Sequence, residues 1–346
     1  MYLLRTVTGQ ISEIEEKIYP PIADWKEVLK ITEKVDPQAL TILTDKYLNG
    51  LPNTYVFSKS LAEAIVWEVR DKIPIVIFRP TIVIASWKEP VPGWMDNFNG
   101  PVGLTIGAGK GIVRTLLSNE DVMADFIMVD CAIKAMIICA WKRATFTRCD
   151  DENIIYNCAS TYKSITNGVL LEMAMKIHER SPLQQVLWYP FIRSRQNLTI
   201  FRLEAIYKHL LPALLVDTIL KLLGKKTMLL KINTKIHVAM LALSYFLLGY
   251  WKFHNKNFLS LMDDVPKKDK EAFDFNFLDM DPEQYFEHCS VPGAKKYLLK
   301  EKNNDPVKER RNLLILKYLH YATLTAFRIM LIWAAYKIYC LYTSEI

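Results

Sequence analysis

Hydrophobic and polar positions divide this chain into a region of alternating helices and strands and a longer, mostly helical region. Between residues 51 and 160, amphipathic stretches alternate with short apolar runs, which is typical of an α/β fold with a parallel sheet. The predicted helices are 55–72, 112–117 and 131–143, and the predicted strands are 73–78, 125–129 and 153–158. The apolar stripe expected on helix 55–72 consists of Leu61, Ala62, Ile65, Val66 and Val69.

After residue 164 the pattern predicts no further strands. The main apolar helices are expected over 201–223 and 236–251, followed by a charged amphipathic stretch over 263–276. The run 236–250 is too short to cross a membrane unaided, so a buried or monolayer-embedded helix is favoured there.

The C-terminal segment 313–342 is nearly all apolar and follows a basic flank, which is typical of the cytosolic side of a membrane-spanning helix. Lys317, Arg328 and Lys337 interrupt it and leave no charge-free stretch of about 18 residues. Two interpretations stay open. One is a spanning helix whose Arg328 and Lys337 extend toward opposite ends; the other is an interfacial helix with a basic stripe.

Composition narrows the function classes. The 346 residues leave room for two domains, and a hydrophobic content of 51% with a mean hydropathy of +0.07 suggests membrane contact. The net charge of +7 suits an anionic lipid surface or an anionic substrate such as a CoA ester. The basic residues are dispersed and no nucleic-acid recognition module is apparent, so nucleic acid is not an expected partner. Six cysteines without CxxC spacing and six histidines without ligand spacing predict intracellular thiols and no metal site.

A tyrosine–lysine pair is the strongest chemical signal. Pro52-Asn53-Thr54 supply a turn and helix-capping residues, and Tyr55 and Lys59 then fall four positions apart on one helix face. An ammonium beside a phenol favours phenolate, which suits a tyrosine that donates a proton to a carbonyl oxygen as hydride reaches its carbon. The next predicted strand ends near Arg79-Pro80, at the carboxyl edge where open α/β sheets bind ligands. This layout is typical of the second half of an extended short-chain dehydrogenase/reductase.

Several segments resemble the eukaryotic fatty acyl-CoA reductases. Residues 52–63 (PNTYVFSKSLAE) resemble the active-site helix of that family, and residues 13–21 resemble the segment upstream of it. The other matching segments are 78–83, 124–130, 211–217, 222–226 and 250–253. The resemblance covers nearly the whole chain from about residue 13 onward, and the insect branch is the one we favour within the family.

The resemblance implies the C-terminal part of a Rossmann-like, doubly wound parallel sheet, followed by a mostly helical C-terminal domain with a hydrophobic terminal helix. It divides the chain into a partial NAD(P)-binding reductase domain (1–195), a helical domain (196–310) and a hydrophobic membrane-associated helix (311–346). Family members often end in a hydrophobic anchor, which favours the spanning interpretation of the last segment. The implied location is an intracellular membrane, endoplasmic reticulum or peroxisome, with the catalytic part facing the cytosol.

The resemblance also implies a reaction. The cofactor would be NADPH, and a long-chain fatty acyl-CoA would be reduced to a primary alcohol by way of the aldehyde. Tyr55 would be the proton donor, while Lys59 would tune it and hydrogen-bond the nicotinamide ribose. Pro80, Thr81 and Ile82 would line the nicotinamide pocket. Membrane lipid is a further expected partner, and homo-oligomerisation is left open.

Neighbouring charged residues are expected to be structural. Arg79 is expected to pair with sheet or helix carboxylates rather than with a CoA phosphate. Glu63 is expected to interact with Lys59 or with solvent. Asp125 and Asp130 flank a predicted strand and are expected to be capping and turn residues.

The sequence also departs from the family. The Gly-rich strand–turn–helix that holds the cofactor pyrophosphate has no counterpart, and neither does the catalytic Ser or Thr upstream of the tyrosine. The Gly-rich stretch 103–111 has neither GxGxxG nor Walker A spacing and is predicted to be a turn-rich loop. Without the first half of the sheet, strand 73–78 is expected to be an exposed hydrophobic edge.

This departure supports a second hypothesis, a catalytically inactive truncated homologue that acts as a membrane-associated interaction protein. A third hypothesis is a soluble extended reductase acting on nucleotide sugars. Such an enzyme would share Tyr55 and Lys59 but would lack the apolar, helical C-terminal half.

Overall fold

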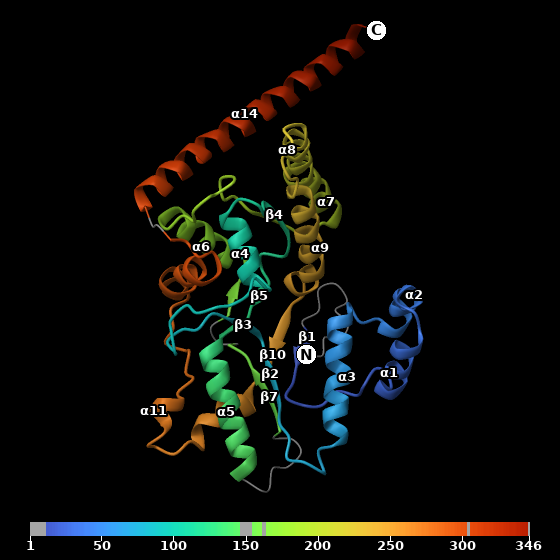
Figure 1. Cartoon of the computed structure of the whole chain (residues 1–346), viewed down its shortest axis with the longest axis vertical. Coiled ribbons are helices and arrows are strands. Elements are labelled where there is room, and N and C mark those ends of the chain that lie inside the picture. Colours follow the sequence, from blue (N-terminus) through green and yellow to red (C-terminus); the bar gives the residue numbers. More distant parts are fainter. Residues whose placement is uncertain (1–11, 146–153, 161–163, 303–304, 345–346) are drawn as a thin grey trace.

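The computed structural model describes residues 12–145, 154–160, 164–302 and 305–344. The molecule is elongated, with the helices α3 (Thr54–Glu68) and α5 (Val129–Thr145) toward one end and α7–α9 toward the other (Figure 1). The long helix α14 (Pro306–Ser344) leaves the body obliquely and ends beyond α8 (Figure 1).

The strands in the described part of the chain pair two by two, and parallel pairing predominates. The parallel pairs are β1 (Ser12–Ile14) with β10 (Trp251–Phe253), β2 (Ile77–Pro80) with β7 (Ile155–Cys158), β3 (Ile82–Ile84) with β6 (Phe126–Met128), and β4 (Thr115–Leu117) with β9 (Arg193–Arg195). β5 (Met123–Ala124) and β8 (Ile165–Thr166) are antiparallel. An α/β architecture with parallel strands is therefore confirmed. The expectation that strands cease after residue 164 is wrong, because strands of two or three residues carry no periodic signal and form only by pairing with distant segments.

Helices make up most of the remaining described structure. They are α1 (Trp25–Lys34), α2 (Pro37–Leu48), α4 (Pro101–Gly109), α6 (Asn167–Arg180), α7 (Leu198–Ala205), η2 (Ile206–Leu210), α8 (Leu211–Leu222), α9 (Leu229–Leu248), α10 (Lys256–Leu259), η3 (Ser260–Asp263), α11 (Lys270–Phe273), α12 (Pro282–Tyr285), η4 (Phe286–Ser290), α13 (Val291–Gly293) and η5 (Ala294–Leu298). The predicted helices 201–223 and 236–251 correspond to α7–η2–α8 and to α9, although Trp251 belongs to β10.

Two short segments have a structure opposite to the prediction. Residues 112–117, predicted as helix, contain β4, and the stretch 103–111, predicted as a loop, lies mostly in α4. The glycines of α4 allow close packing: a Cβ on Gly109 would lie 2.4 Å from His178 Cε1, and one on Gly107 would lie 2.8 Å from Val113 Cγ2. These glycines therefore allow neighbouring side chains to pack closely against the helix, although a glycine-rich composition usually indicates a turn.

Helix α3 and strand β2 are both shorter than predicted, ending at Glu68 and beginning at Ile77. The buried face of α3 consists of Val56, Phe57, Ser60 and Glu63, whereas the expected stripe residues Ala62 and Ile65 are exposed. Of the strand expected to be an exposed edge, Ile73 is exposed but Ile77 is buried in a cluster with Ile154 and Ile155, against which Ile18, Val66 and Trp67 pack.

The largest hydrophobic core joins α5 to the segment that follows β10. Phe258, Leu261 and Tyr285 pack with Ile127 and Met128 of β6, and the Tyr285 hydroxyl donates to the Ala85 carbonyl oxygen at 2.8 Å. Cys131 and Cys139 on α5 lie in this core, where burial raises the pKa of each thiol to about 12. The predicted domain boundaries stay a prediction.

The described contacts between helix α14 and the body lie in the first half of the helix. Leu313 and His320 are buried, Trp188 Nε1 donates to His320 Nδ1 at 3.0 Å, and Lys317 Nζ lies 2.8 Å from Glu179 Oε1. No helix within the described ranges is long and apolar enough to cross a membrane. The spanning interpretation of 313–342 is therefore not supported, because charged and polar residues interrupt the apolar run too often.

Candidate active site

The tyrosine–lysine pair lies on the first two turns of α3. The helix begins at Thr54 because the Asn53 side chain accepts a hydrogen bond from the Val56 amide at 2.9 Å. Tyr55 and Lys59 are both exposed, and Lys59 Nζ lies 5.9 Å from the centroid of the Tyr55 ring. The predicted juxtaposition of phenol and ammonium on one face is present, and both groups are accessible to a ligand.

The start of α3 meets the carboxyl ends of β2 and β7. Val56 is fully buried in a cluster that includes Ala159, the residue directly after β7. Pro80 pairs with Cys158, and the Thr81 amide donates to the Cys158 carbonyl oxygen at 3.0 Å. The start of α3 therefore packs beside the end of β7, and Pro80 and Thr81 lie at the same strand edge, which is where parallel α/β sheets place their ligands.

The half-buried carboxylate of Asp125 joins two distant segments at this edge. Asp125 Oδ1 accepts from Thr81 Oγ1 at 2.8 Å and from the Ser160 amide at 2.7 Å. Burial raises the pKa of Asp125, and the hydrogen bonds from Ser160 and Thr81 act in the opposite direction. Asp125 was expected to be a capping residue, but it joins positions 35 and 44 residues away. Asp130, for which the same role was expected, lies in the first turn of α5, and its carboxylate accepts from the amides of Trp87, Lys88 and Glu89, 41 to 43 residues away.

Apolar side chains lie at the strand edge and beside Tyr55. Ile82 and Val83 follow Thr81 and are 36% and 42% exposed, so they present apolar surface at this edge. Phe246, from the far end of α9, meets Tyr55 edge to face with ring centroids 6.4 Å apart. Sequence reasoning missed Phe246, because nothing in the pattern of α9 indicates a partner almost 200 residues away.

Arg79 is a structural residue, as expected. Its guanidinium forms a bidentate ion pair with the Glu63 carboxylate, with Nε–Oε1 and Nη2–Oε2 distances of 2.8 and 2.7 Å. It also donates hydrogen bonds to the Glu15 and Lys17 carbonyl oxygens. Arg79 and Glu63 are both buried. The expectation that Glu63 pairs with Lys59 or solvent is wrong, because Glu63 faces inward toward the strand.

The arrangement fits the nicotinamide end of a dinucleotide. Tyr55 and Lys59 offer a hydroxyl and an ammonium that are free to reach a ribose and a carbonyl oxygen, and Ile82 offers apolar surface for a planar ring. The Gly-rich helix α4 does not fit the pyrophosphate end, because its glycines pack against His178 and Val113.

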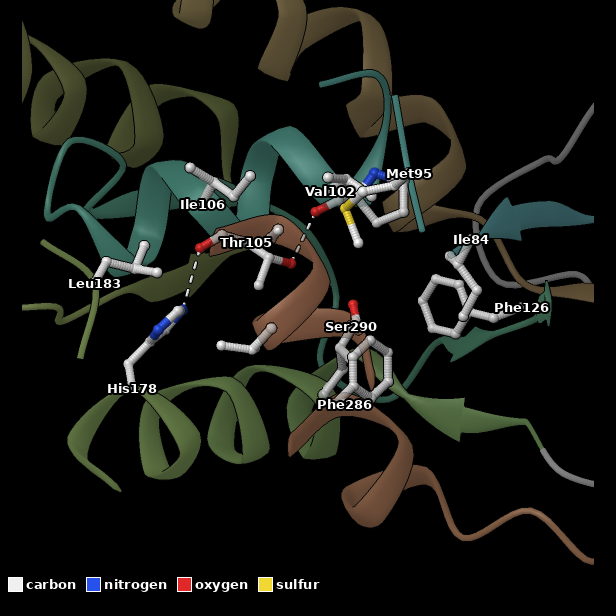
Figure 2. Close-up of a pocket in the computed structure, with 14 residues that line it drawn as sticks. Ile84, Met95, Val102, Thr105, Ile106, Phe126, His178, Leu183, Phe286 and Ser290 are labelled. Carbon is white, nitrogen blue, oxygen red and sulfur yellow. Dashed lines mark hydrogen bonds between the residues drawn. The ribbon is translucent and has the colours of Figure 1, made fainter. Parts of the chain in front are cut away.

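A small apolar cavity lies apart from these residues, between α4, α6 and the η4–α13 segment (Figure 2). Its volume is about 30 Å³, far below the roughly 300–1,000 Å³ of ligand pockets, and neither Tyr55 nor Lys59 lines it. His178 lies in its wall, with Nε2 3.3 Å from the Thr105 carbonyl oxygen (Figure 2). Burial lowers the pKa of His178 to about 4.

This histidine predicts a pH dependence of stability. In the unfolded chain His178 takes up a proton below about pH 6.5, whereas in the folded protein it stays neutral down to about pH 4. The free energy of unfolding is therefore expected to fall as the pH drops from about 6.5 to about 4. The loss due to His178 is about 3 kcal/mol. Denaturant titrations between pH 7 and 4 on a His178→Phe variant should show a shallower slope. An unchanged slope would contradict this assignment, and His288→Gln, at an exposed position, is the control.

Comparisons with known proteins show which family this chain resembles. Two family models, both described as male sterility protein, match residues 6–136 and 208–301, and the first of them is a nicotinamide-dinucleotide-binding model. The chain is 34% identical to fatty acyl-CoA reductase 1 of Xenopus laevis over 325 residues, which is 94% of this chain and 62% of that protein. It is 33% identical to the Homo sapiens protein over 92% of this chain and 62% of that protein. A putative fatty acyl-CoA reductase of Drosophila melanogaster is 32% identical over 93% of this chain and 63% of that protein.

The chain thus spans somewhat less than two thirds of the length of these relatives. Vertebrate and insect proteins are similar to it at comparable identity, so the insect branch stays a prediction. Both halves of the chain match, the strand-containing part with Tyr55 and Lys59 and the helical part that supplies Phe246. The chain belongs to the fatty acyl-CoA reductase family.

Proposed function

We propose that this chain catalyses the NADPH-dependent reduction of a long-chain fatty acyl-CoA to a primary fatty alcohol by way of the aldehyde. The observation that carries the proposal is the exposed Tyr55–Lys59 pair at the carboxyl edge of the β2–β7 pair. The relatives are named fatty acyl-CoA reductases, which supports the substrate class. The choice of NADPH over NADH rests on the resemblance of residues 52–63 to the active-site helix of the family.

The bound cofactor supplies hydride to the thioester carbonyl carbon. Tyr55 donates its hydroxyl proton to the carbonyl oxygen, and the Lys59 ammonium stabilises the phenolate left behind. The hemithioacetal hydroxyl then returns its proton to the Tyr55 phenolate as the carbon–sulfur bond breaks, and the leaving CoA thiolate takes up a proton from solvent, which gives an aldehyde and free CoA thiol. A second reduction, with a second equivalent of cofactor and with reprotonated Tyr55 as proton donor, gives the primary alcohol.

Other residues hold this geometry. Pro80, Thr81 and Ile82 would line the nicotinamide pocket, with Thr81 fixed by its bond to Asp125. Phe246 limits the positions open to the Tyr55 ring.

We further propose that α14 lies at the surface of an intracellular membrane, endoplasmic reticulum or peroxisome, with the catalytic part on the cytosolic side. Its exposed apolar side chains, which include Ile329, Ile332 and Trp333, support that arrangement.

Cofactor binding tests the proposal most directly. The purified chain in detergent is titrated with NADPH and with NADH by cofactor fluorescence, beside a Tyr55→Phe/Lys59→Ala double variant. We expect saturable binding that favours NADPH and that the double variant weakens. A folded chain that binds neither dinucleotide would overturn the catalytic proposal and favour the second candidate, a catalytically inactive interaction protein. Equal binding by the double variant would remove Tyr55 and Lys59 from the site.

A further inference from the structure

The helices α8 and α9 form a hairpin whose α8 end points away from α5, toward the side of the molecule where α14 also ends (Figure 1). The eight residues of its tip, 221–228, are all exposed. Leu222, Leu223 and Met228 at this tip are 82%, 64% and 58% exposed. Apolar exposure continues along α8 through Leu211, Leu214, Leu215, Val216 and Ile219. A contiguous apolar surface of this kind marks an interaction site.

The tip has a defined backbone structure. The Asp217 carboxylate accepts from the amides of Met228, Leu229 and Leu230, so that a residue of α8 caps the start of α9. Gly224 turns the chain with a φ of +67°, and the Lys225 amide closes the end of α8 on the Leu220 carbonyl oxygen at 2.8 Å. The leucines are therefore held outward by the hairpin itself.

Positive charge surrounds the apolar tip. Lys221, Lys225 and Lys226 lie in it, and Lys231 and Lys235 follow on the first turns of α9; all five are exposed. Between residues 205 and 250 Asp217 is the one acidic residue in the sequence, and its carboxylate is occupied by the cap. Within the described residues no salt bridge neutralises these lysines.

We propose that the α8–α9 tip docks on an anionic lipid surface, with Leu222, Leu223 and Met228 entering the headgroup region and the lysines pairing with lipid phosphates or carboxylates. Exposed leucines flanked by lysines match both the apolar and the charged layer of such an interface. A second copy of the chain is a poorer occupant, because it would bring the same lysines against these ones. The end of α14 lies toward the same end of the molecule (Figure 1), so the two elements can meet one membrane surface.

Flotation of the full chain with vesicles tests this docking. Vesicles of phosphatidylcholine alone are compared with vesicles that contain phosphatidylserine in addition. We expect stronger binding to the anionic vesicles, weakened by salt. A Lys225→Glu/Lys226→Glu variant is expected to lose at least about 30-fold in affinity for anionic vesicles. A Leu222→Ser/Leu223→Ser variant is expected to lose at least about 10-fold on the same vesicles.

Matched variants distinguish docking through the tip from a general effect of net charge and from binding through α14. Lys30→Glu/Lys34→Glu makes the same charge change on exposed positions of α1 and is expected to keep most of the binding. Ile329→Ser/Ile332→Ser in α14 measures the share of that helix. Circular dichroism confirms that each variant is folded. Tip variants that bind lipid like the unmodified chain would overturn the proposal. So would tip variants that lower the mass in sedimentation without affecting lipid binding, because they would assign the tip to a second copy.

Discussion

Replacing Tyr55 with phenylalanine is expected to lower acyl-CoA turnover by about 100- to 10,000-fold, the usual contribution of a positioned proton donor. The hydroxyl is the one group removed, and the ring keeps its contact with Phe246 and its position beside Lys59. Cofactor binding should therefore fall much less than turnover. Two readouts of the same reaction measure turnover, the consumption of NADPH and the release of free CoA thiol. Cofactor binding is measured by the fluorescence titration.

An exposed tyrosine elsewhere provides the control. Tyr318 on α14 is 75% exposed, and Tyr318→Phe is expected to leave turnover unchanged. A Tyr55→Phe variant that retains full turnover would exclude Tyr55 as the proton donor. Loss of cofactor binding and turnover in equal measure would instead assign the hydroxyl to binding.

Replacing Arg79 with methionine is expected to destabilise the fold by about 3–5 kcal/mol, because the buried Glu63 carboxylate would lose its partner. Since domains are stable by only about 5–15 kcal/mol, this loss would remove a large part of the stability of the fold. The guanidinium also holds the Glu15 and Lys17 carbonyl oxygens, so the segment before α1 should loosen as well. Denaturant unfolding followed by circular dichroism measures the change.

A double variant distinguishes a lost partner from a lost side chain. Arg79→Met/Glu63→Leu removes both charges and is expected to recover most of the stability, because an apolar pair can replace a buried ion pair. Lys176→Met breaks the exposed Lys176–Glu172 pair on α6 and should change stability little. If Arg79→Met were as mild as Lys176→Met, the buried pair would not be a stabilising element of this fold.

Local signals allowed the chemical face of the site to be predicted from the sequence. The capping residue Asn53 fixes where α3 begins, and the spacing of four places Tyr55 and Lys59 on one face whatever the rest of the chain does. The alternation of helix and apolar run likewise predicted α5 and the parallel strands β2, β6 and β7. These features depend on neighbours within a few residues or on burial patterns within one element.

The sequence by itself therefore determined the α/β class, the tyrosine–lysine face and the family of this protein. Only the tertiary structure decided which side of α3 is buried, because Glu63 faces inward to a guanidinium 16 residues away. It also decided that Asp125 holds Thr81 and that β10 pairs with β1 across 239 residues. It placed the leucines and lysines at residues 221–228 on an exposed tip. Contacts between distant segments depend on how the whole chain packs, so they leave no periodic trace in any single stretch of sequence.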